Sequence, residues 1–136
     1  MIQMEIPGVP VPKGRPRLGR YGTYTPQKTK DYEDKIRMSA RRVMSHYPGI
    51  ILEGALEVIV TVILPVPGSY SKTRRERCLA GLDRPIVRPD LDNYLKCLDA
   101  LNGIVWKDDS QVVTITAQKK YGEEPRMIVT VLKKGE

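Results

Sequence analysis

The chain has 136 residues, with 23 Lys and Arg against 16 Asp and Glu, which gives a formal net charge of +7. This length fits one compact domain spanning residues 1–136. With 40% hydrophobic and 29% charged residues, the composition excludes a disordered tail and a membrane protein. Such an excess of positive charge is typical of proteins that bind a polyanion.

The positions of cysteine, histidine and apolar residues exclude further classes. Cys78 and Cys97 form no C-x-x-C pair, so we expect neither a zinc ribbon nor a disulfide framework, and two thiols suit a reducing cytoplasm. The single histidine, His46, has no partner at metal-ligand spacing and is interpreted as a surface residue. Glu and Pro interrupt the first 16 residues, and the longest apolar run, residues 58–66, is too short to span a bilayer. We therefore expect a soluble, cytoplasmic protein without a membrane partner.

The first half of the chain predicts a strand, a loop and a long helix. Apolar and polar residues alternate over residues 2–6, which is the period of a half-buried strand. Three prolines between residues 7 and 12 then take the chain out of the sheet. Residues 13–26 are rich in Gly, Pro and Arg without periodicity and predict an exposed loop. Apolar residues at helical spacing predict a helix from about Gln27 to Tyr47, which Pro48-Gly49 ends.

The second half predicts three strands and two short helices. Residues 56–64 are β-branched and apolar on both faces, as in a central strand. Helices are predicted over residues 71–82 and 90–101. Strands are predicted over residues 112–121 and 127–132, and the four residues between them suit an antiparallel hairpin. The order β-α-β-α-α-β-β predicts an α+β fold with helices packed on a mixed sheet.

Positive charge is concentrated in two segments. Residues 13–42 contain ten basic residues and three acids, and residues 72–88 contain six basic residues and two acids. A charge run is usually the solvated face of a helix. The four basic residues of the loop, however, have no nearby acid, and two tyrosines follow them closely. A basic loop with interleaved aromatic residues is typical of contact with a phosphate backbone.

An acidic segment interrupts this basic chain. Residues 90–109 contain five aspartates against two lysines. On a helix, Asp92, Lys96 and Asp99 would fall within an arc of roughly 60°, while apolar residues take most of the remaining circumference. A buried stretch at residues 104–106 would return the next two aspartates to the same vicinity. Carboxylates at a helix start and at a strand start are the oxygen ligands that Mg²⁺ takes in proteins.

Each acidic feature also has a purely structural explanation. Asp90 would cap a helix, and Asp108 with Asp109 would form a turn. Asp92 and Lys96 would form an i,i+4 ion pair on a solvated face. The residues by themselves leave the metal site and these structural roles open.

Two strings of residues together resemble a known family. The first is Arg88-Pro89-Asp90-Leu91-Asp92-Asn93, then Lys96, then Asp99-Ala100-Leu101-Asn102-Gly103, then Asp108-Asp109-x-Gln111-Val112. The second is the opening Gly8-x-Pro10-x-Pro12-Lys13-Gly14-Arg15-Pro16-Arg17. The first string closely resembles the motif of the RusA family of Holliday-junction resolvases. The second is similar to the opening segment of many phage-type members of this family.

The resemblance implies a homodimeric, Mg²⁺-dependent crossover junction endodeoxyribonuclease, with Mn²⁺ as a substitute and no nucleotide cofactor. Such an enzyme makes paired nicks in four-way DNA junctions during recombination and repair. The resemblance implies Asp90, Asp92 and Asp109 as catalytic, metal-binding acids, Asp108 as a further candidate ligand and Lys96 as the catalytic lysine. Supporting roles fall to Asn93, Asp99, Asn102 and Gln111. The candidate DNA-binding residues are Lys13, Arg15, Arg17, Arg20, Arg74, Arg75 and Arg88.

Two other functions stay open at this point. One is a less selective nuclease that cuts flaps or forks. The other is a non-catalytic protein that binds branched DNA, in which the aspartates only cap and turn the chain.

Overall fold

A four-stranded mixed sheet is the framework of the computed structural model, which describes residues 1–135. Its strand order is β1-β6-β4-β5. The strands are β1 (Ile2–Pro7), β4 (Leu56–Leu64), β5 (Val112–Tyr121) and β6 (Arg126–Lys133). β6 runs antiparallel to both β1 and β4, whereas β5 runs parallel to β4. The expected α+β class and the central position of residues 56–64 are confirmed.

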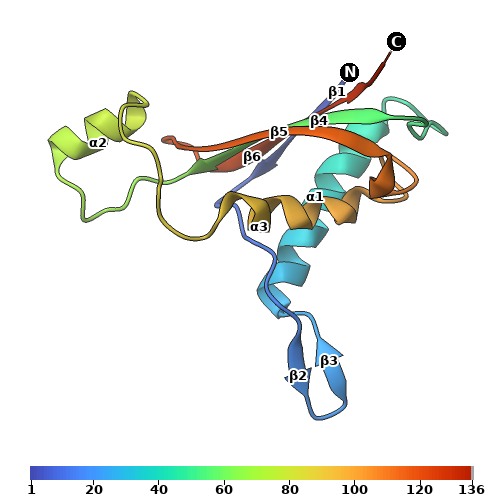
Figure 1. Ribbon diagram of the computed structural model, residues 1–136, viewed down its shortest axis with the longest axis horizontal. Coiled ribbons are helices and arrows are strands. Elements are labelled where there is room, and N and C mark those ends of the chain that lie inside the picture. The colour runs from blue at the N-terminus through green and yellow to red at the C-terminus, as the bar shows by residue number, and fades with distance from the viewer. Residues whose placement is uncertain (136) are drawn as a thin grey trace.

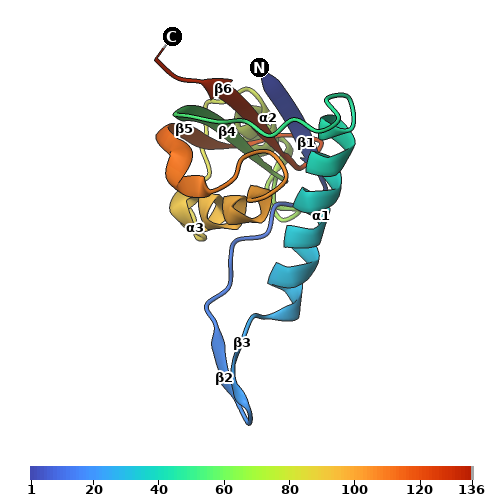
Figure 2. The ribbon, with the colours of Figure 1, turned by 90° about the vertical axis from the view of Figure 1, so that its right-hand side faces the viewer.

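Helices cover one face of this sheet (Figures 1 and 2). They are α1 (Gln27–Met44) and the consecutive segments α3 (Leu91–Leu95) and η1 (Lys96–Leu101), the latter a 3-10 helix. A third helix, α2 (Lys72–Leu79), lies beyond one end of the sheet, and a single 3-10 turn, η2 (Asp109–Gln111), precedes β5. No helix within residues 1–135 is both long and apolar enough to cross a membrane.

The main core lies between the sheet and these helices. Alternate strand residues point into it, because successive side chains of a strand face opposite sides. From α1, the core receives Tyr32, Ile36, Ala40 and Met44, which recur at helical spacing. Trp106, the largest fully buried side chain, joins it from the segment before β5. The expected burial of residues 104–106 is therefore confirmed for Val105 and Trp106, whereas Ile104 is half-buried.

A smaller cluster holds α2 against the end of the sheet. Cys78 of α2 packs with Val66 and Tyr121, and all three are buried. The basic side of α2 stays exposed, and the Arg74 guanidinium lies 3.6 Å from the centroid of the Tyr70 ring. The predicted helix over residues 71–82 is thus present in shortened form.

The prediction of an antiparallel hairpin between the last two strands is wrong. β4 lies between β5 and β6, so the connection at residues 122–125 crosses the end of β4. Gly122 makes this crossing: its N–H donates to the Leu64 carbonyl at 3.0 Å, and a Cβ there would come within 2.5 Å of Ile63. A short loop therefore permits either a hairpin or a crossing over one strand, and length alone does not separate them.

Three expected boundaries also need correction. The loop predicted over residues 13–26 contains a short hairpin, β2 (Arg17–Gly19) and β3 (Gly22–Tyr24), which stands off from the sheet (Figure 2). The helix predicted to about Tyr47 ends at Met44. The helix predicted over residues 90–101 is α-helical only to Leu95 and tightens into the 3-10 segment η1.

Candidate active site and nucleic-acid interface

All five candidate aspartates lie in the connection between β4 and β5, residues 65–111. Parallel neighbouring strands require such a crossover, and here it carries α2, α3, η1 and η2. Asp90 occupies the N-cap position of α3, but its side chain makes no capping hydrogen bond. Asp92 follows in the first turn, and both carboxylates are exposed. The start of α3 therefore presents two exposed carboxylates, and neither is used to cap the helix.

The start of α3 is held in place by Lys119, which sequence analysis did not select. Its Nζ donates to the carbonyl oxygens of Val87 at 2.7 Å and Pro89 at 3.0 Å. Lys119 lies two residues from both Ala117 and Tyr121, so it shares the inward face of β5 with them. A lysine at an inward position of a strand is the sequence signal that could have identified it.

Lys96 lies one turn after Asp92, as the sequence predicted. Its Nζ is 3.9 Å from a carboxylate oxygen of Asp92 and 3.4 Å from Oδ1 of Asn93. Lys96 also borders a cavity of about 440 Å³, here called the central cavity. The residues that line it are Lys13, Leu95, Lys96, Leu98, Asp99, Trp106, Asp109, Val112 and Ile115. It thus joins residues of α3 and η1 to residues at the start of β5.

A bulge shapes the β5 side of the central cavity. Leu56 of β4 pairs with Val112, but the next residue pairs with Thr114, so Val113 has no partner. This extra residue lets Val112 and Ile115 line the same cavity, although they stand three positions apart. Asp109 lies just before the bulge.

The structure separates the roles of Asp108 and Asp109. Asp109 lines the central cavity, whereas Asp108 lines a separate cavity with Glu53 and Ser110. The Asp108 carboxylate accepts a hydrogen bond from the Ser110 N–H at 3.1 Å. Hydrogen bonding to the Ser110 side chain, and secondarily to this N–H, holds the pKa of Asp108 below its ordinary value. Asp108 therefore caps η2, and of these two aspartates Asp109 is the one that lines the central cavity together with Lys96.

Gln111 fixes the turn that carries both aspartates. Its Oε1 accepts hydrogen bonds from the N–H groups of Lys107 at 2.9 Å and Asp108 at 3.1 Å. Its Nε2 donates to the carbonyl oxygens of Leu52 at 3.0 Å and Gly54 at 3.1 Å. Gln111 thus ties the η2 turn to the segment that enters β4.

Asn102 has a comparable supporting position at the end of η1. Its Oδ1 accepts a hydrogen bond from Nε1 of the buried Trp106 at 2.6 Å. Gly103 follows with a φ of 80°, and its N–H donates to the Trp106 carbonyl at 2.7 Å. This compact turn brings the chain from η1 back toward β5 and the central cavity.

Lys13 joins the basic N-terminal segment to the central cavity. Its N–H donates to the Asn93 carbonyl at 2.9 Å, and its Nζ lies 2.7 Å from Asp99 and 3.6 Å from Glu33. The hydrogen bond to Asp99 raises the pKa of Lys13. Lys13 was proposed as a DNA-binding residue, and the structure places its ammonium against two carboxylates. The second oxygen of Asp99, Oδ1, is buried without a hydrogen-bond partner among the described residues.

Glu33 is a buried acid that sequence analysis did not select. Only 8% of its surface is exposed, and burial raises its pKa above the ordinary value despite the opposing charge of Lys13. Glu33 stands three residues before Ile36, and therefore on the core side of α1. An acid in phase with core residues is the signal that could have found it. Nearby, burial raises the pKa of Cys97 to about 12, so this thiol stays protonated at neutral pH.

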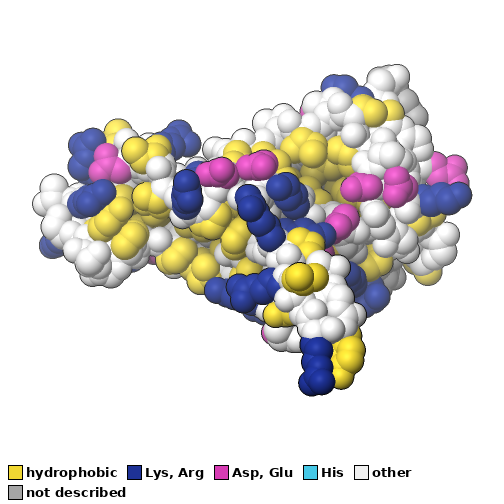
Figure 3. All heavy atoms as spheres, turned by 60° about the horizontal axis from the view of Figure 1, so that its bottom comes forward, with side chains coloured by type: hydrophobic (Ala, Val, Ile, Leu, Met, Phe, Trp, Pro, Cys, Tyr) yellow, Lys and Arg dark blue, Asp and Glu magenta, His cyan; other side chains and the backbone are white. Residues whose placement is uncertain are grey.

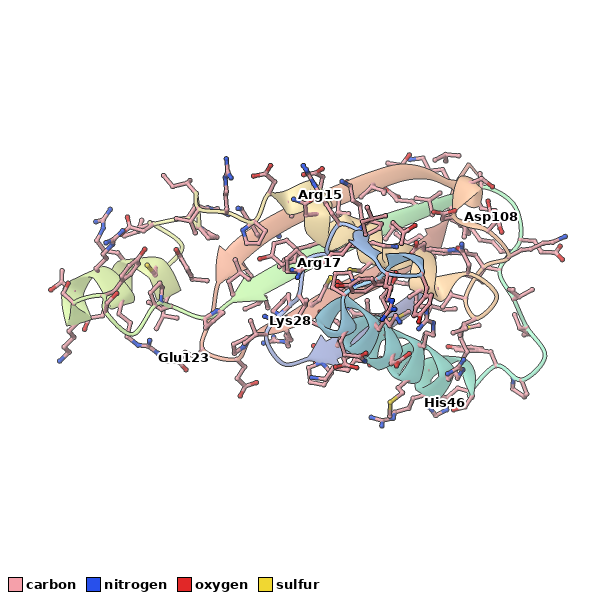
Figure 4. All side chains as sticks on the ribbon, turned by 90° about the horizontal axis from the view of Figure 1, so that it is seen from below. Arg15, Arg17, Lys28, His46, Asp108 and Glu123 are labelled. Atoms are coloured by element: carbon pink, nitrogen blue, oxygen red, sulfur yellow. The ribbon has the colours of Figure 1, made fainter. Side chains whose placement is uncertain are left out.

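Two further cavities continue from the central cavity along the basic segment. A cavity of about 380 Å³ shares Lys13 and Lys96 with the central cavity and adds Arg15 and Asn93. A third, of about 340 Å³, shares Arg15 and adds Arg17 and Lys28. Figure 3 shows acidic side chains beside a group of Lys and Arg side chains on this face, and Figure 4 places the labelled Arg15, Arg17 and Lys28 near one another.

The remaining basic candidates lie outside these three cavities. Arg20 is in the turn of the β2–β3 hairpin, and Arg88 is exposed two residues before Asp90. Arg74 and Arg75 lie on α2, at the far end of the molecule (Figure 1). His46 is exposed beyond the end of α1, as expected, and Figure 4 shows it away from the basic group. Lys13, Arg15 and Arg17 therefore form a near group at these cavities, and Arg74 and Arg75 form a far group on α2.

The donor set fits a hard divalent cation. No three Asp, Glu, His or Cys side chains within residues 1–135 are close enough to form a metal-binding cluster. Mg²⁺, however, needs only one or two protein carboxylates, because water and substrate phosphate supply the remaining oxygens. Asp90 and Asp92 at the start of α3, with Asp109 at the central cavity, offer carboxylate oxygen alone.

Two comparisons relate the whole chain to known proteins. The family model described as Endodeoxyribonuclease RusA matches residues 7–132. The chain is also 39% identical over 137 residues to the uncharacterized protein YqaN of Bacillus subtilis (strain 168), an alignment that covers 96% of this chain and 94% of that protein.

Proposed function

The chain belongs to the RusA family of endodeoxyribonucleases, and we propose that it resolves four-way DNA junctions as a Mg²⁺-dependent homodimer that makes paired nicks. The observation that carries the proposal is the central cavity. Lys96 and Asp109 border it together, the exposed Asp92 lies 3.9 Å from Lys96, and a basic cavity continues from it. Carboxylates, one ammonium group and an adjoining basic surface are what phosphodiester hydrolysis requires.

The metal is proposed to be held by Asp90, Asp92 and Asp109, with Mn²⁺ as a substitute. When bound, a divalent ion supplies positive charge to the scissile phosphate and orients the attacking water. Asp108 remains at its capping position, where its contact with Ser110 fixes the turn that presents Asp109.

Lys96 is proposed to stabilise the charge that develops on the phosphate. Its ammonium lies at the border of the first two cavities, near the Asn93 amide oxygen. An ammonium aimed at a developing charge lowers the barrier more in a partly enclosed site than in open water. Arg15 and Arg17 would bind the neighbouring phosphates, since both line the cavities that follow.

A second copy of the chain is proposed to supply the second cut. A four-way junction has two-fold symmetry and needs two incisions, and a two-fold dimer places one site on each strand of like polarity. The described residues of one chain carry one cavity with this combination of groups.

The test is a cleavage assay on three substrates, namely a four-way junction, a flap and a linear duplex, with and without Mg²⁺. We expect Mg²⁺-dependent, symmetric pairs of nicks in the junction. Scattered cleavage that favours the flap would point instead to a less selective nuclease. Binding without cleavage under all conditions would point to a non-catalytic DNA-binding protein.

We expect Asp92→Asn to reduce junction cleavage to the level seen without Mg²⁺, while binding survives or tightens. The change removes one carboxylate ligand and one negative charge next to the substrate. Asp34→Asn is the matched control, because Asp34 is exposed on α1 and pairs with Arg37. Undiminished cleavage by the Asp92 variant would contradict the metal-site assignment.

A further inference from the structure

The β2–β3 hairpin, residues 17–24, forms an arm that stands off from the rest of the molecule (Figures 1 and 2). Two of its large side chains are almost entirely in solvent: Leu18 is 87% exposed and Tyr21 is 95% exposed. Tyr21 lies in the two-residue turn with Arg20, whose guanidinium is 5.7 Å from the centroid of the Tyr21 ring. The tip of the arm is therefore both apolar and cationic.

The arm has its own internal support, which leaves its tip free. Gly19 pairs with Gly22, and a Cβ at Gly19 would meet the Tyr24 ring at 3.0 Å, so this ring packs across the hairpin. Gly22 has a φ of +117°, a conformation that favours glycine. Tyr24 thus stabilises the hairpin, whereas Leu18 and Tyr21 contribute no comparable packing.

The segment that leads into the arm is fixed on two sides, to α3 and to α1. Lys13 bonds through its N–H to the Asn93 carbonyl of α3. The Gly14 N–H donates to Oγ1 of Thr29 in α1 at 2.9 Å, and a Cβ at Gly14 would crowd Thr29 and Pro26 at 3.0 and 3.1 Å. The cavities lined by Arg15 and Arg17 lead from the central cavity toward the arm. A substrate bound at Lys96 can therefore extend to the arm along a basic path.

The composition of the arm identifies the chemistry of its partner. The arm and its flanking residues, 13–30, contain no acid, so the partner is anionic, yet the tip adds a ring and a branched aliphatic group to the charge of Arg20. Unstacked nucleic acid combines a phosphate backbone with flat apolar base faces. A continuous duplex hides those faces, whereas a branch point or a single strand exposes them.

We propose that the arm tip is a base-stacking element, in which Tyr21 stacks on an unstacked base and Leu18 packs against its neighbour. This inference rests on the proposed function and adds a residue basis for recognising the branch. Arg15 and Arg17 contact phosphates that every duplex also has. The arm tip supplies the preference for branched DNA.

The test compares the full-length protein with Tyr21→Ala on a four-way junction, a single strand and a linear duplex, without divalent ion. Loss of one stacked base is expected to weaken junction and single-strand binding by about tenfold. Duplex binding and the salt dependence of all three affinities should stay unchanged, because no charge is removed. Tyr21→Phe should retain wild-type binding, and Leu18→Ala should show a smaller loss with the same substrate pattern.

Tyr47→Ala is the matched control, since Tyr47 is another exposed tyrosine, located beyond the opposite end of α1. Equal losses on the duplex, or no loss on any substrate, would overturn the inference while leaving junction cleavage by the wild-type protein intact. A change in oligomeric mass without a change in junction preference would assign the tip to a protein contact and also overturn it. Failure of the wild-type protein to prefer or cut junctions would instead overturn the proposed function, and single-strand binding would still test stacking.

Discussion

Glu33 is the residue whose environment departs furthest from what a charged side chain prefers. It lies on the core side of α1, where burial raises the pKa of its carboxyl group. A raised carboxyl pKa in the folded state means that folding favours the protonated form. The contribution of Glu33 to stability is therefore fully present below its ordinary pKa of 4.5 and is lost as the pH rises through the elevated value.

We expect Glu33→Gln to remove this loss of stability at high pH. At pH 7 the variant should have a higher free energy of unfolding than the wild-type protein, and the difference should vanish below about pH 4.5. The contact of Lys13 with Asp99, at 2.7 Å, is shorter than that with Glu33, at 3.6 Å, and is expected to persist in the variant. Urea unfolding at several pH values, followed by the fluorescence of the single tryptophan, measures the difference. Glu123→Gln, at an exposed loop residue labelled in Figure 4, should show no such pH dependence.

The segment around η2 shows how one side chain organises an element. Gln111 accepts two backbone hydrogen bonds within the turn and donates two to the chain entering β4. All four hydrogen bonds hold the turn that carries Asp109. The position of Asp109 therefore depends on the side-chain amide of Gln111, which does not line the central cavity.

We expect Gln111→Ala to lower the free energy of unfolding by about 1–2 kcal/mol, which is the cost of losing a cap and its hydrogen bonds. Junction cleavage should fall as well, because the turn that presents Asp109 loosens. Gln118→Ala is the control, since Gln118 is exposed on β5 and makes none of these contacts. Equal effects of the two changes on stability and cleavage would contradict the role given to Gln111.

At the scale of helices and strands, sequence periodicity predicted where the elements lie better than it predicted which strands pair with each other. The strands over residues 56–64 and 112–121 are present within their predicted bounds, because β-branched and alternating residues bury one face. The predicted pairing of the last two strands was wrong, because a four-residue connection can either close a hairpin or cross the end of β4. The need for glycine at position 122 follows only from its close approach to Ile63, which the sequence does not reveal. The arm at residues 17–24 was missed because its strands are too short to show a period.

The candidate site was predictable where neighbouring residues share a local element, and not where distant segments meet. The proximity of Asp92 and Lys96 follows from their helical spacing, and the structure contains it as an ion pair. The choice of Asp109 over Asp108 at the central cavity depends on contacts with Ser110 and the bulge in β5. Similarly, the contact between Lys13 and Asp99 joins two parts of the chain that no local pattern connects.

Over the whole molecule, the net charge of +7 is arranged around the site rather than spread evenly. A basic segment with Arg15 and Arg17 adjoins the central cavity, and the basic face of α2 lies at the far end of the sheet. Counterion release from DNA makes the affinity of such a surface depend steeply on salt. The two basic regions are therefore expected to contribute phosphate contacts on separate parts of a branched substrate.

We expect Arg15→Ala and Arg17→Ala each to weaken DNA binding and to reduce the slope of log affinity against log salt by about one unit, the value for one lost phosphate contact. The loss should be similar for junction and duplex, unlike the substrate-dependent effect at Tyr21. Arg42→Ala is the control, because Arg42 lies toward the other end of α1, beside Glu5 and Pro7. Titrations at several salt concentrations give the slopes, and unchanged slopes would show that this segment makes no phosphate contact.

The parallel pairing of β4 and β5 has a consequence for how the protein folds. Hydrogen bonds between these strands form only after residues 65–111 have closed into a loop, and that closure costs entropy before any pairing repays it. The same loop carries every candidate aspartate together with Lys96. The pairing of β4 with β6 closes a still longer stretch of the chain, which contains β5 itself. We therefore expect nuclease activity to emerge late in refolding, only when the edge strand β5 has joined the sheet.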